Sequence, residues 1–293
     1  MKDNGLLKYY QDKHKAKTLI NKKNLLNDNN ENVYIPLHGN VRAVTLPEGD
    51  FYIKKVGKHE RDAEILLSQI YAKAGFTTAI YTPVGSKGFY THVASNDIKQ
   101  GKNLISQKMF NRNNHVEVKQ DIEDSMAKFN IGENMFYMPQ SKQEEHIDYS
   151  KYITKEAMQT LIKMRLFDVA GCNTDRHGTN FFLDVEDNVV KDIALIDYSM
   201  SGRMFNSKQE LFFINEFSAK SLSDFEFLKA LEKNEIARDY ISLQECAESV
   251  GSVDVLGTAQ EIKEEIGYKL DDKYVDKIAS SFDMFATGIS MLK

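Results

Sequence analysis

The sequence predicts an α+β protein with two lobes, in which a small antiparallel sheet with one main helix precedes a mostly helical second lobe. Short turns rich in Gly, Pro, Asn and Asp separate strand-like segments in the first third of the chain. These predicted strands cover 33–37, 41–46, 51–56, 78–84 and 88–94. A helix predicted at 59–76 interrupts them, and four capping-box pairs further along the chain predict the helical lobe.

The two main helices are predicted from apolar residues that recur every three or four positions. The helix at 59–76 ends near Gly75, a residue type that favours the backbone conformation found just after a helix. A second helix is predicted at 154–171. The apolar stripes consist of Ala63, Leu66, Leu67, Ile70 and Ala74 in the first helix, and of Met158, Leu161, Ile162, Leu166 and Val169 in the second.

The rest of the second lobe is predicted from local signals. A β-hairpin is expected over 181–197, and helices are expected near 102–110 and 118–129. The capping-box pairs are Ser207/Glu210, Ser223/Glu226, Ser242/Glu245 and Thr258/Glu261. The predicted organisation is a lysine-rich N-terminal segment (1–32), a first lobe (33–96) and a second lobe (97–293) that contains a loop region at 171–199.

Composition excludes several classes of protein. The chain has 293 residues and a formal net charge of −5, whereas a dedicated nucleic-acid binder normally has a basic surface. Cys172 and Cys246 are too few for a disulfide framework, which favours a cytoplasmic protein. No transmembrane segment is expected, because no apolar run approaches roughly 20 residues, and the N-terminus lacks the apolar stretch of a signal peptide. A specialised injection system would leave no such signal, so delivery into another cell stays open.

The segment 171–199 carries the strongest functional signal. Phosphoryl transfer depends on positioning, on metal charge near the terminal phosphates and on a carboxylate near the attacking hydroxyl. In protein kinases a catalytic Asp precedes a metal-binding Asn by five positions, and a second metal-binding Asp lies across a hairpin. Asp175 and Asn180 have this spacing, and Asp197 follows the predicted hairpin. The pattern therefore predicts two oxygen ligands for Mg²⁺, Asn180 and Asp197.

The order Asp-Arg-His-x-x-Asn, followed by a strand that ends in Ile-Asp, resembles the catalytic and metal-binding loops of HipA-like kinases and phosphatidylinositol 3- and 4-kinases. Conventional protein kinases have His-Arg-Asp instead. The resemblance covers about residues 33–200 and implies an atypical kinase with a two-lobed, protein-kinase-like fold that uses ATP and Mg²⁺. It implies these roles: Asp175 as catalytic base, Asn180 and Asp197 as metal ligands, and Arg176 and His177 as supports for the phosphates or the loop.

A kinase also needs a lysine for the α- and β-phosphates and a glutamate on the next helix that holds the lysine. Lys54 and Lys55 both lie in the strand 51–56, on opposite faces, so only one of them can point into a cleft. Two apolar residues precede Lys54, as in HipA-like kinases, and we therefore prefer Lys54. Glu64 is the expected partner by the same resemblance, and Glu60, one helical turn earlier, is the alternative.

The other parts of a nucleotide site are less distinctive. Gly39 and Asn40 precede the lysine strand, where a glycine-rich phosphate loop would lie, but this turn has a single glycine. Its backbone amides could still bind phosphate. The segment 91–96 is the candidate linker whose backbone would contact adenine.

The leading functional hypothesis is a serine/threonine protein kinase that transfers the γ-phosphoryl group of ATP to a protein hydroxyl. Autophosphorylation would be consistent with the resemblance, with Ser199, Ser201 and Ser207 as candidate acceptors. A phosphoinositide lipid kinase is the alternative, but only Arg203 and Lys208 follow the metal-binding Asp closely enough to bind a lipid headgroup.

Two further classes of protein fit the sequence less well. A pseudokinase, or nucleotide-dependent binding module, would have lost one of the key residues, and all of them are present. A metal hydrolase normally has clustered His and Cys ligands, whereas the seven histidines here are scattered.

Overall fold

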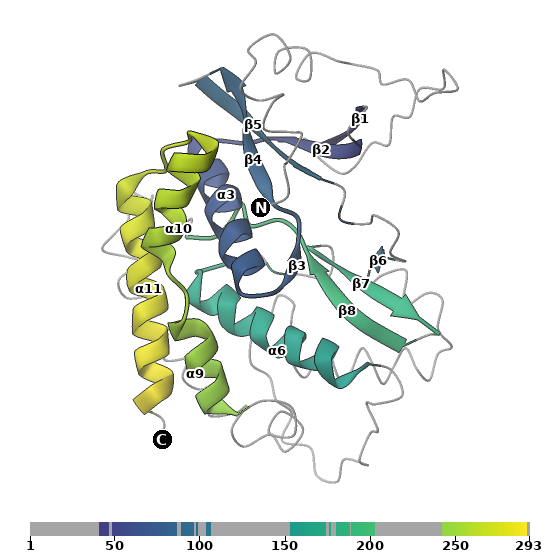
Figure 1. Ribbon diagram of the computed structural model, residues 1–293, viewed down its shortest axis with the longest axis vertical. Helices are drawn as coiled ribbons and strands as arrows, with labels where there is room; N and C mark the ends of the chain where they lie inside the picture. The colour runs from purple at the N-terminus through teal and green to yellow at the C-terminus, as the bar shows by residue number, and fades with distance from the viewer. Residues whose placement is uncertain are drawn as a thin grey trace.

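The computed structural model describes residues 41–46, 49–86, 89–96, 98, 104–106, 153–173, 176, 180–187, 189–202 and 242–291. Within these residues the chain forms two four-stranded sheets, with helices packed around them (Figure 1). The strands are β1 (Val41–Leu46), β2 (Gly49–Lys55), β3 (Thr77–Thr78), β4 (Tyr81–Ser86), β5 (Phe89–Asn96), β6 (Leu104–Ser106), β7 (Phe181–Glu186) and β8 (Val189–Leu195). The helices are α3 (Lys58–Lys73), α6 (Lys155–Ala170), α9 (Leu243–Gly251), α10 (Val255–Glu261), the π-helix η3 (Ile262–Ile266) and α11 (Asp272–Met291).

The first sheet is antiparallel and has the strand order β1-β2-β5-β4. β2 lies between β1 and β5, and Lys54 is paired with Val41 on one side and with Val93 on the other. The lysine strand is therefore a central strand, and α3 packs against the β4 and β5 part of this sheet. The predicted small antiparallel sheet with one main helix is confirmed.

The second sheet brings the segment after α3 next to the β7–β8 hairpin. Its strand order is β3-β8-β7-β6, and β7 and β8 pair antiparallel, with Phe181 opposite Leu195. The short strand β3 pairs in parallel with the end of β8, and Ala79 N donates to Leu195 O at 3.0 Å. The chain that leaves α3 thus runs beside the end of β8, close to Asp197.

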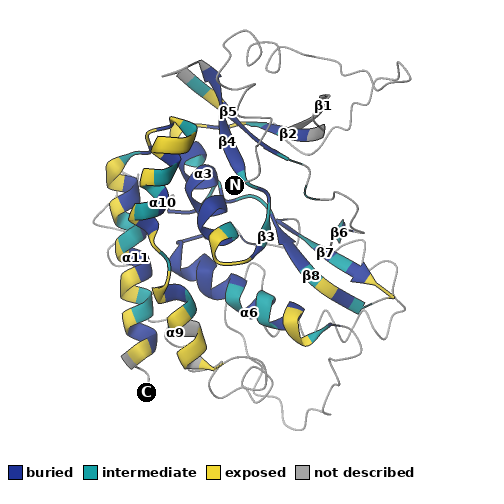
Figure 2. Cartoon of the chain, in the orientation of Figure 1, coloured by how far each residue is buried: buried dark blue, intermediate teal, exposed yellow. Residues whose placement is uncertain are grey.

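Helix α3 is buried on all sides rather than along one stripe. Every residue from 61 to 71 is buried, including the charged side chains of Asp62 and Glu64. Figure 2 shows this contrast: α3 is largely buried, whereas α9, α10 and α11 keep exposed outer faces. α3 contacts the first sheet and α10 as well, so the helix is enclosed between the two lobes.

The predicted ends of the main helices agree with the structure in most respects. Gly75 has φ +89°, the left-handed conformation expected after a helix. Ala74, predicted as part of the apolar stripe, is exposed and lies just beyond the end of α3 at Lys73. Thr154 caps α6 by accepting a hydrogen bond from Ala157 N at 3.2 Å. The predicted apolar stripe of α6 is buried throughout.

Of the capping-box pairs, Ser242/Glu245 is confirmed, with both hydrogen bonds present at 3.1 and 2.7 Å. The Thr258/Glu261 prediction was wrong. Asp254 caps α10 by accepting from Gly257 N at 2.7 Å, and the Thr258 hydroxyl donates to Asp254 O inside the helix. A threonine hydroxyl can bond the carbonyl four residues earlier, so it need not mark a helix start. Ser207/Glu210 and Ser223/Glu226 lie outside the described residues.

Two other expectations need correction. Residues 104–106 form β6, paired with β7, where a helix was expected. The segment 91–96, expected to be a linker, belongs to β5 and pairs with both β2 and β4. The strand at 33–37 and the helix near 118–129 lie outside the described residues.

Buried apolar residues of both lobes form one continuous core, which includes Val93 of β5, Leu66 of α3 and Leu183 of β7. A small antiparallel sheet with one helix, followed by a largely helical part around a hairpin, agrees with the predicted α+β fold class. Among the described helices, none has the length and apolar character needed to cross a membrane.

Candidate active site

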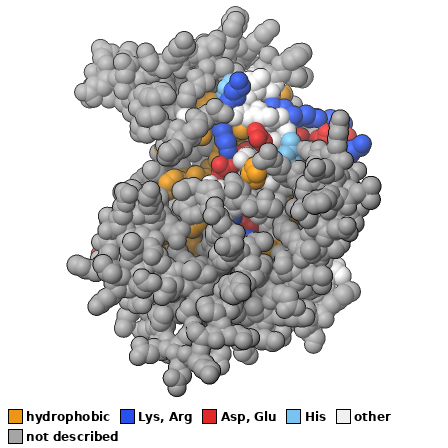
Figure 3. Space-filling view, turned by 180° about the vertical axis from the view of Figure 1, so that it is seen from behind, with side chains coloured by type: hydrophobic (Ala, Val, Ile, Leu, Met, Phe, Trp, Pro, Cys, Tyr) orange, Lys and Arg blue, Asp and Glu red, His pale blue; other side chains and the backbone are white. Residues whose placement is uncertain are grey.

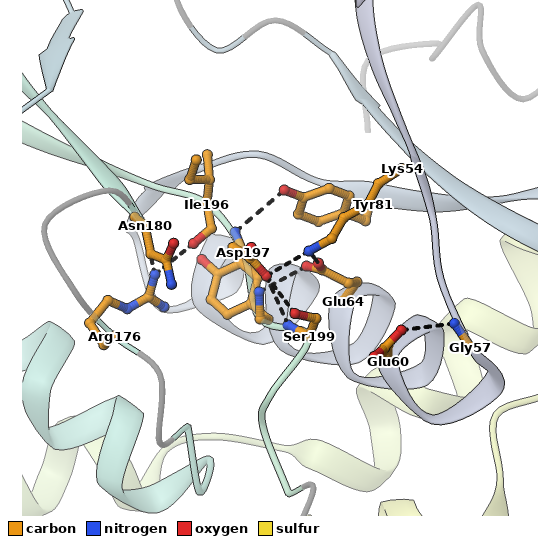
Figure 4. A network of polar contacts seen from close by, with 11 residues as sticks. Lys54, Gly57, Glu60, Glu64, Tyr81, Arg176, Asn180, Ile196, Asp197 and Ser199 are labelled. Atoms are coloured by element: carbon orange, nitrogen blue, oxygen red, sulfur yellow. Dashed lines mark hydrogen bonds and ion pairs between the residues drawn. The ribbon is translucent and has the colours of Figure 1, made fainter. Parts of the chain in front are cut away.

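Lys54 lies between two carboxylates that come from different parts of the chain. Its Nζ atom is 2.9 Å from Oε1 of Glu64 and 2.8 Å from Oδ1 of Asp197 (Figure 4). The Lys54 side chain is 20% exposed, whereas Lys55, on the opposite face of β2, is exposed to solvent. Strand alternation thus directs Lys54, and not Lys55, toward α3 and the end of β8.

Each carboxylate oxygen of Glu64 accepts a hydrogen bond. Oε1 accepts from Lys54, and Oε2 accepts from the backbone N of Tyr198 at 2.9 Å. The Glu64 side chain is completely buried, so these charge-assisted hydrogen bonds replace its lost hydration. Glu60, the alternative partner, instead accepts from Gly57 N at 2.9 Å and caps the start of α3. Glu64 therefore joins the lysine strand to the segment after β8.

Asp197 directs one carboxylate oxygen to the protein. Its Oδ1 atom accepts from Lys54 Nζ, from Ser199 N at 3.2 Å and from Ser199 Oγ at 2.7 Å. Within the described residues no donor reaches Oδ2, and the side chain is 31% exposed. The backbone of Asp197 has φ 59°, a left-handed conformation that costs about 1–3 kcal/mol in a non-glycine residue. Such strain is concentrated at functional sites.

The three charges shift one another's pKa values. Burial opposes ionisation of Asp197, but the charge of Lys54 and the hydrogen bonds from Lys54 and Ser199 outweigh it and lower the pKa of Asp197 to about 2. Burial lowers the pKa of Lys54, yet the charges of Glu64 and Asp197 raise it above its ordinary value. Burial raises the pKa of Glu64 further than Lys54 lowers it. The pKa shifts of the two carboxyl groups differ in direction although both pair with Lys54, because Glu64 is completely buried and close to the negative charge of Asp197, whereas Asp197 is less buried and also accepts hydrogen bonds from Ser199.

Arg176 connects the loop to the ends of the hairpin. Its Nη1 atom donates to Asn180 O at 2.7 Å and to Ile196 O at 2.6 Å (Figure 4). Its Nε atom forms a buried ion pair with Asp168 Oδ2 at 3.0 Å, where the side chains are 1% and 0% exposed. Burial opposes the charge of Arg176, but Asp168 raises the pKa of Arg176 above its ordinary value. Arg176 thus supports the loop, one of the two roles expected for it.

The partners of Arg176 were missed in the sequence. Asp168, near the end of α6, also accepts from Tyr71 OH at 2.8 Å and from Asn173 Nδ2 at 3.0 Å. The sequence contained a signal for this role, because an acidic residue among the apolar residues of α6 is almost never buried without a partner. Asp168 therefore anchors the start of the loop to α3 and α6.

Tyr198, which directly follows Asp197, was also missed in the sequence. Its hydroxyl and Thr78 Oγ1 are 2.6 Å apart, and the guanidinium carbon of Arg176 lies 5.1 Å from the centre of its ring. The adjacent Asp197 N donates to Tyr81 OH at 3.4 Å. Tyr198 is fully buried, so these contacts hold the backbone on which Asp197 is carried.

The hairpin brings Asn180 next to Asp197. Asn180 directly precedes β7, and its carbonyl oxygen accepts from Ile196 N at 3.1 Å, across from the end of β8 (Figure 4). An amide oxygen and an ionised carboxylate are suitable ligands for a hard divalent cation such as Mg²⁺. The low pKa of Asp197 and the absence of a described donor to Oδ2 fit that role.

The other predicted site residues have different outcomes. Asp175, His177, Gly39 and Asn40 lie outside the described residues. Among the candidate phosphoacceptors, Ser201 is fully buried and Ser199 is bonded to Asp197, whereas Ser207 lies outside the described residues. Figure 3 shows basic and acidic side chains next to one another on the face opposite to that of Figure 1, so charged groups reach the surface there. In the parts of the chain that the structure describes, no three His, Cys, Asp or Glu residues are grouped to hold a metal ion.

Solved structures that resemble this chain include the following two. One is the crystal structure of the proinflammatory kinase CtkA of Helicobacter pylori, with 15% sequence identity and a TM-score of 0.48, covering 88% of this chain and 96% of that chain. The other belongs to the Shewanella oneidensis MR-1 toxin–antitoxin complex of HipA, HipB and operator DNA, with 9% identity and a TM-score of 0.48, covering 94% of this chain and 69% of that chain. No family model matches, and no curated protein is significantly similar in sequence.

Proposed function

We propose that this protein is an ATP-dependent phosphotransferase of the HipA-like kinase type, which transfers the γ-phosphoryl group to a serine or threonine hydroxyl of a protein. One observation carries the proposal. The ammonium group of Lys54 lies within 2.9 Å of Glu64 and 2.8 Å of Asp197, although the three residues come from a strand, a helix and the end of a hairpin. A lysine held by a helix glutamate beside a metal-binding aspartate is the arrangement that phosphoryl transfer requires.

Lys54 would bind the α- and β-phosphates of ATP. Its pKa lies above the ordinary value, so the ammonium group keeps its charge at neutral pH. Glu64 restrains the ammonium group and, through Tyr198 N, fixes its distance from the segment that carries Asp197. A preorganised charge of this kind stabilises phosphate without reorganisation during the reaction.

Asn180 and Asp197 would hold Mg²⁺ through their side-chain oxygens. When bound, Mg²⁺ neutralises charge on the terminal phosphates. The protein's own contribution is the position of the two ligands. Arg176 donates to the carbonyl groups of Asn180 and Ile196, so one side chain restrains the backbone at both ends of the hairpin.

Asp175 would be the catalytic base, by its spacing from Asn180 and by the resemblance. Its carboxylate would accept the proton of the acceptor hydroxyl as that oxygen bonds to the γ-phosphorus. The bond from the γ-phosphorus to the bridging oxygen of ADP breaks, and ADP leaves with the electron pair. Asp175 directly precedes Arg176, and the Arg176 side chain forms a buried ion pair with Asp168.

A protein acceptor is favoured over a phosphoinositide. A lipid kinase needs cations that bind the headgroup phosphates, and the sequence 198–210 offers Arg203 and Lys208 alone. Both lie outside the described residues. The preference for a protein therefore rests on the sequence.

The decisive experiment supplies [γ-³²P]ATP and Mg²⁺ to the full chain, with a generic protein substrate in one reaction and phosphatidylinositol vesicles in another. We expect label on protein, including the enzyme itself, and loss of label in Lys54→Met but not in Lys55→Met. Label on lipid alone would overturn the proposed acceptor. Binding of Mg-ATP without transfer to either acceptor would instead support a nucleotide-dependent binding module.

A further inference from the structure

The acidic side chains of Asp62 and Glu64 project from opposite sides of α3. Asp62 and Glu64 are two positions apart, which corresponds to about 200° around an α-helix. Glu64 points to Lys54, whereas Asp62 points to the C-terminal part of the chain, where Tyr268 OH donates to its Oδ1 atom at 2.5 Å. Both carboxylates are buried, with 0% and 1% exposure. The helix that carries Glu64 is therefore held from the side opposite the site.

On the side of α3 opposite Glu64 lies a network of polar contacts that we call the Tyr268 contact. It is formed by Arg61, Asp62, Tyr90, Tyr268 and Asp271. Arg61 Nε donates to Tyr268 OH at 2.9 Å, and Arg61 Nη1 donates to Tyr90 O in β5 at 2.6 Å. Asp271 N donates to the second oxygen of Asp62 at 3.3 Å. The Tyr268 ring meets that of Tyr90 edge-on, with centroids 5.1 Å apart. One tyrosine thus joins the C-terminal segment to α3 and to the first sheet.

The backbone before Tyr268 is unusual. η3 occupies Ile262–Ile266, and a π-helical turn of this kind is rare and often found at functional sites. Gly267 follows with φ +71°, a conformation that side chains rarely adopt. These two features turn the chain so that the next residue, Tyr268, faces Asp62.

We infer that the Tyr268 contact holds α3 at the position that brings Glu64 within reach of Lys54, which makes Tyr268 a positioning residue for the binding of ATP. The Lys54–Glu64 bond of 2.9 Å leaves little room for movement, because a side-chain contact at 3.6 Å is no longer a hydrogen bond. The Tyr268 hydroxyl bonds both Asp62 and Arg61 of α3, so its loss removes a restraint on the position of the helix. The inference rests on the proposed function.

The first test does not need nucleotide. Tyr268→Phe keeps the ring against Tyr90 and removes the hydroxyl that contacts Asp62 and Arg61. A double-mutant cycle with Lys54→Met and Glu64→Gln measures the coupling of the ion pair from urea unfolding. We expect the coupling to be largely lost when the cycle is repeated in Tyr268→Phe. Ile289→Val, a small change in the buried part of α11, is the control for general destabilisation and should leave the coupling intact.

The second test measures the affinity for Mg-ATP by calorimetry. Loss of the Tyr268 hydrogen bonds should weaken ATP binding by about tenfold, the effect of roughly one such bond. Ile289→Val should bind ATP as the wild type does, and Tyr268→Phe should have no further effect on the remaining affinity of Lys54→Met. The Michaelis constant for the protein acceptor should not change.

The two tests separate the inference from the proposed function. If Tyr268→Phe leaves both the coupling and the ATP affinity equal to those of Ile289→Val, the positioning role is wrong although the kinase proposal stands. If the wild-type protein binds no ATP but the coupling is lost in Tyr268→Phe, the kinase proposal fails and the positioning role stands.

Discussion

Lys54 Nζ and Asp197 Oδ1 are 2.8 Å apart, although 143 positions of sequence separate the two residues. The contact forms where β2, near the start of the described chain, passes the end of the β7–β8 hairpin. Ser199 donates twice to the same oxygen, so Oδ2 is the Asp197 oxygen that faces no described donor. The fold thus places the cation directly beside the proposed metal ligand.

Replacing Lys54 tests the phosphate contact. Lys54→Met should reduce the affinity for Mg-ATP by about tenfold to hundredfold, because a charge-assisted hydrogen bond contributes about 1.5–3 kcal/mol. Lys55→Met is the matched control, since Lys55 lies on the exposed face of the same strand. Calorimetric titration measures the affinity of each variant for Mg-ATP. Equal losses in the two variants would contradict the assignment of Lys54.

Glu64→Gln tests the link between α3 and the segment after β8. A glutamine places an NH₂ group where one of the two carboxylate oxygens stood, so this group would face Lys54 Nζ or Tyr198 N, both of which are donors. We expect the free energy of unfolding to fall by about 1–3 kcal/mol and phosphotransfer to fall as well. Glu60→Gln is the control, because glutamine can also complete a capping box. Chemical denaturation and a labelled-ATP assay give the two readouts.

The low pKa of Asp197 predicts a specific acid dependence of stability. The pKa falls from 3.8 to about 2 on folding, so the ionised form is stabilised in the folded state. The contribution, up to about 2 kcal/mol, is complete above about pH 4 and is lost as the pH falls toward 2. Urea unfolding between pH 4 and 2 should show a shallower loss of stability in Asp197→Asn than in the wild type.

Glu64 does not obscure this window. Burial raises the pKa of Glu64 above its ordinary value, so below pH 4 its carboxyl is largely protonated in the folded and the unfolded protein. Its contribution to stability is present at low pH and is lost as the pH rises through its folded pKa. Identical slopes for wild type and Asp197→Asn between pH 4 and 2 would therefore contradict the Lys54–Asp197 ion pair.

Arg176→Met tests the anchor of the loop. The change leaves Asp168 buried without its cation, and breaking a buried ion pair in this way costs about 3–5 kcal/mol. Tyr71 and Asn173 still donate to Asp168, so we expect the lower end of that range. In Lys269→Met the broken pair is exposed to solvent, so the expected loss of stability is much smaller. Thermal and urea unfolding compare the two variants, and similar costs would show that Arg176 is not an anchor.

Much of the fold follows from local sequence patterns. Apolar periodicity located α3 and α6, and turn residues separated β1, β2 and the β7–β8 hairpin. The prediction that Thr258 caps a helix was wrong because the sequence spacing is ambiguous. A threonine inside a helix, bonded back to Asp254 O, can have the same spacing to a following acidic residue as a threonine that caps a helix. The helix prediction at residues 104–106 was wrong because a three-residue strand is stabilised by its partner strand, β7, and not by its own sequence.

The sequence by itself determined the two lobes, the hairpin that joins Asn180 to Asp197, and Lys54 and Glu64 as the preferred pair. Tertiary structure alone decided that Glu64 also holds Tyr198 N, that Arg176 pairs with Asp168, and that Tyr268 bonds Asp62 across 206 positions. The physical reason is the distance along the chain over which each kind of signal acts. Periodicity and capping report on neighbours within one turn or one strand, whereas these contacts depend on how α3 packs between the sheet and the C-terminal segment, which no local pattern encodes.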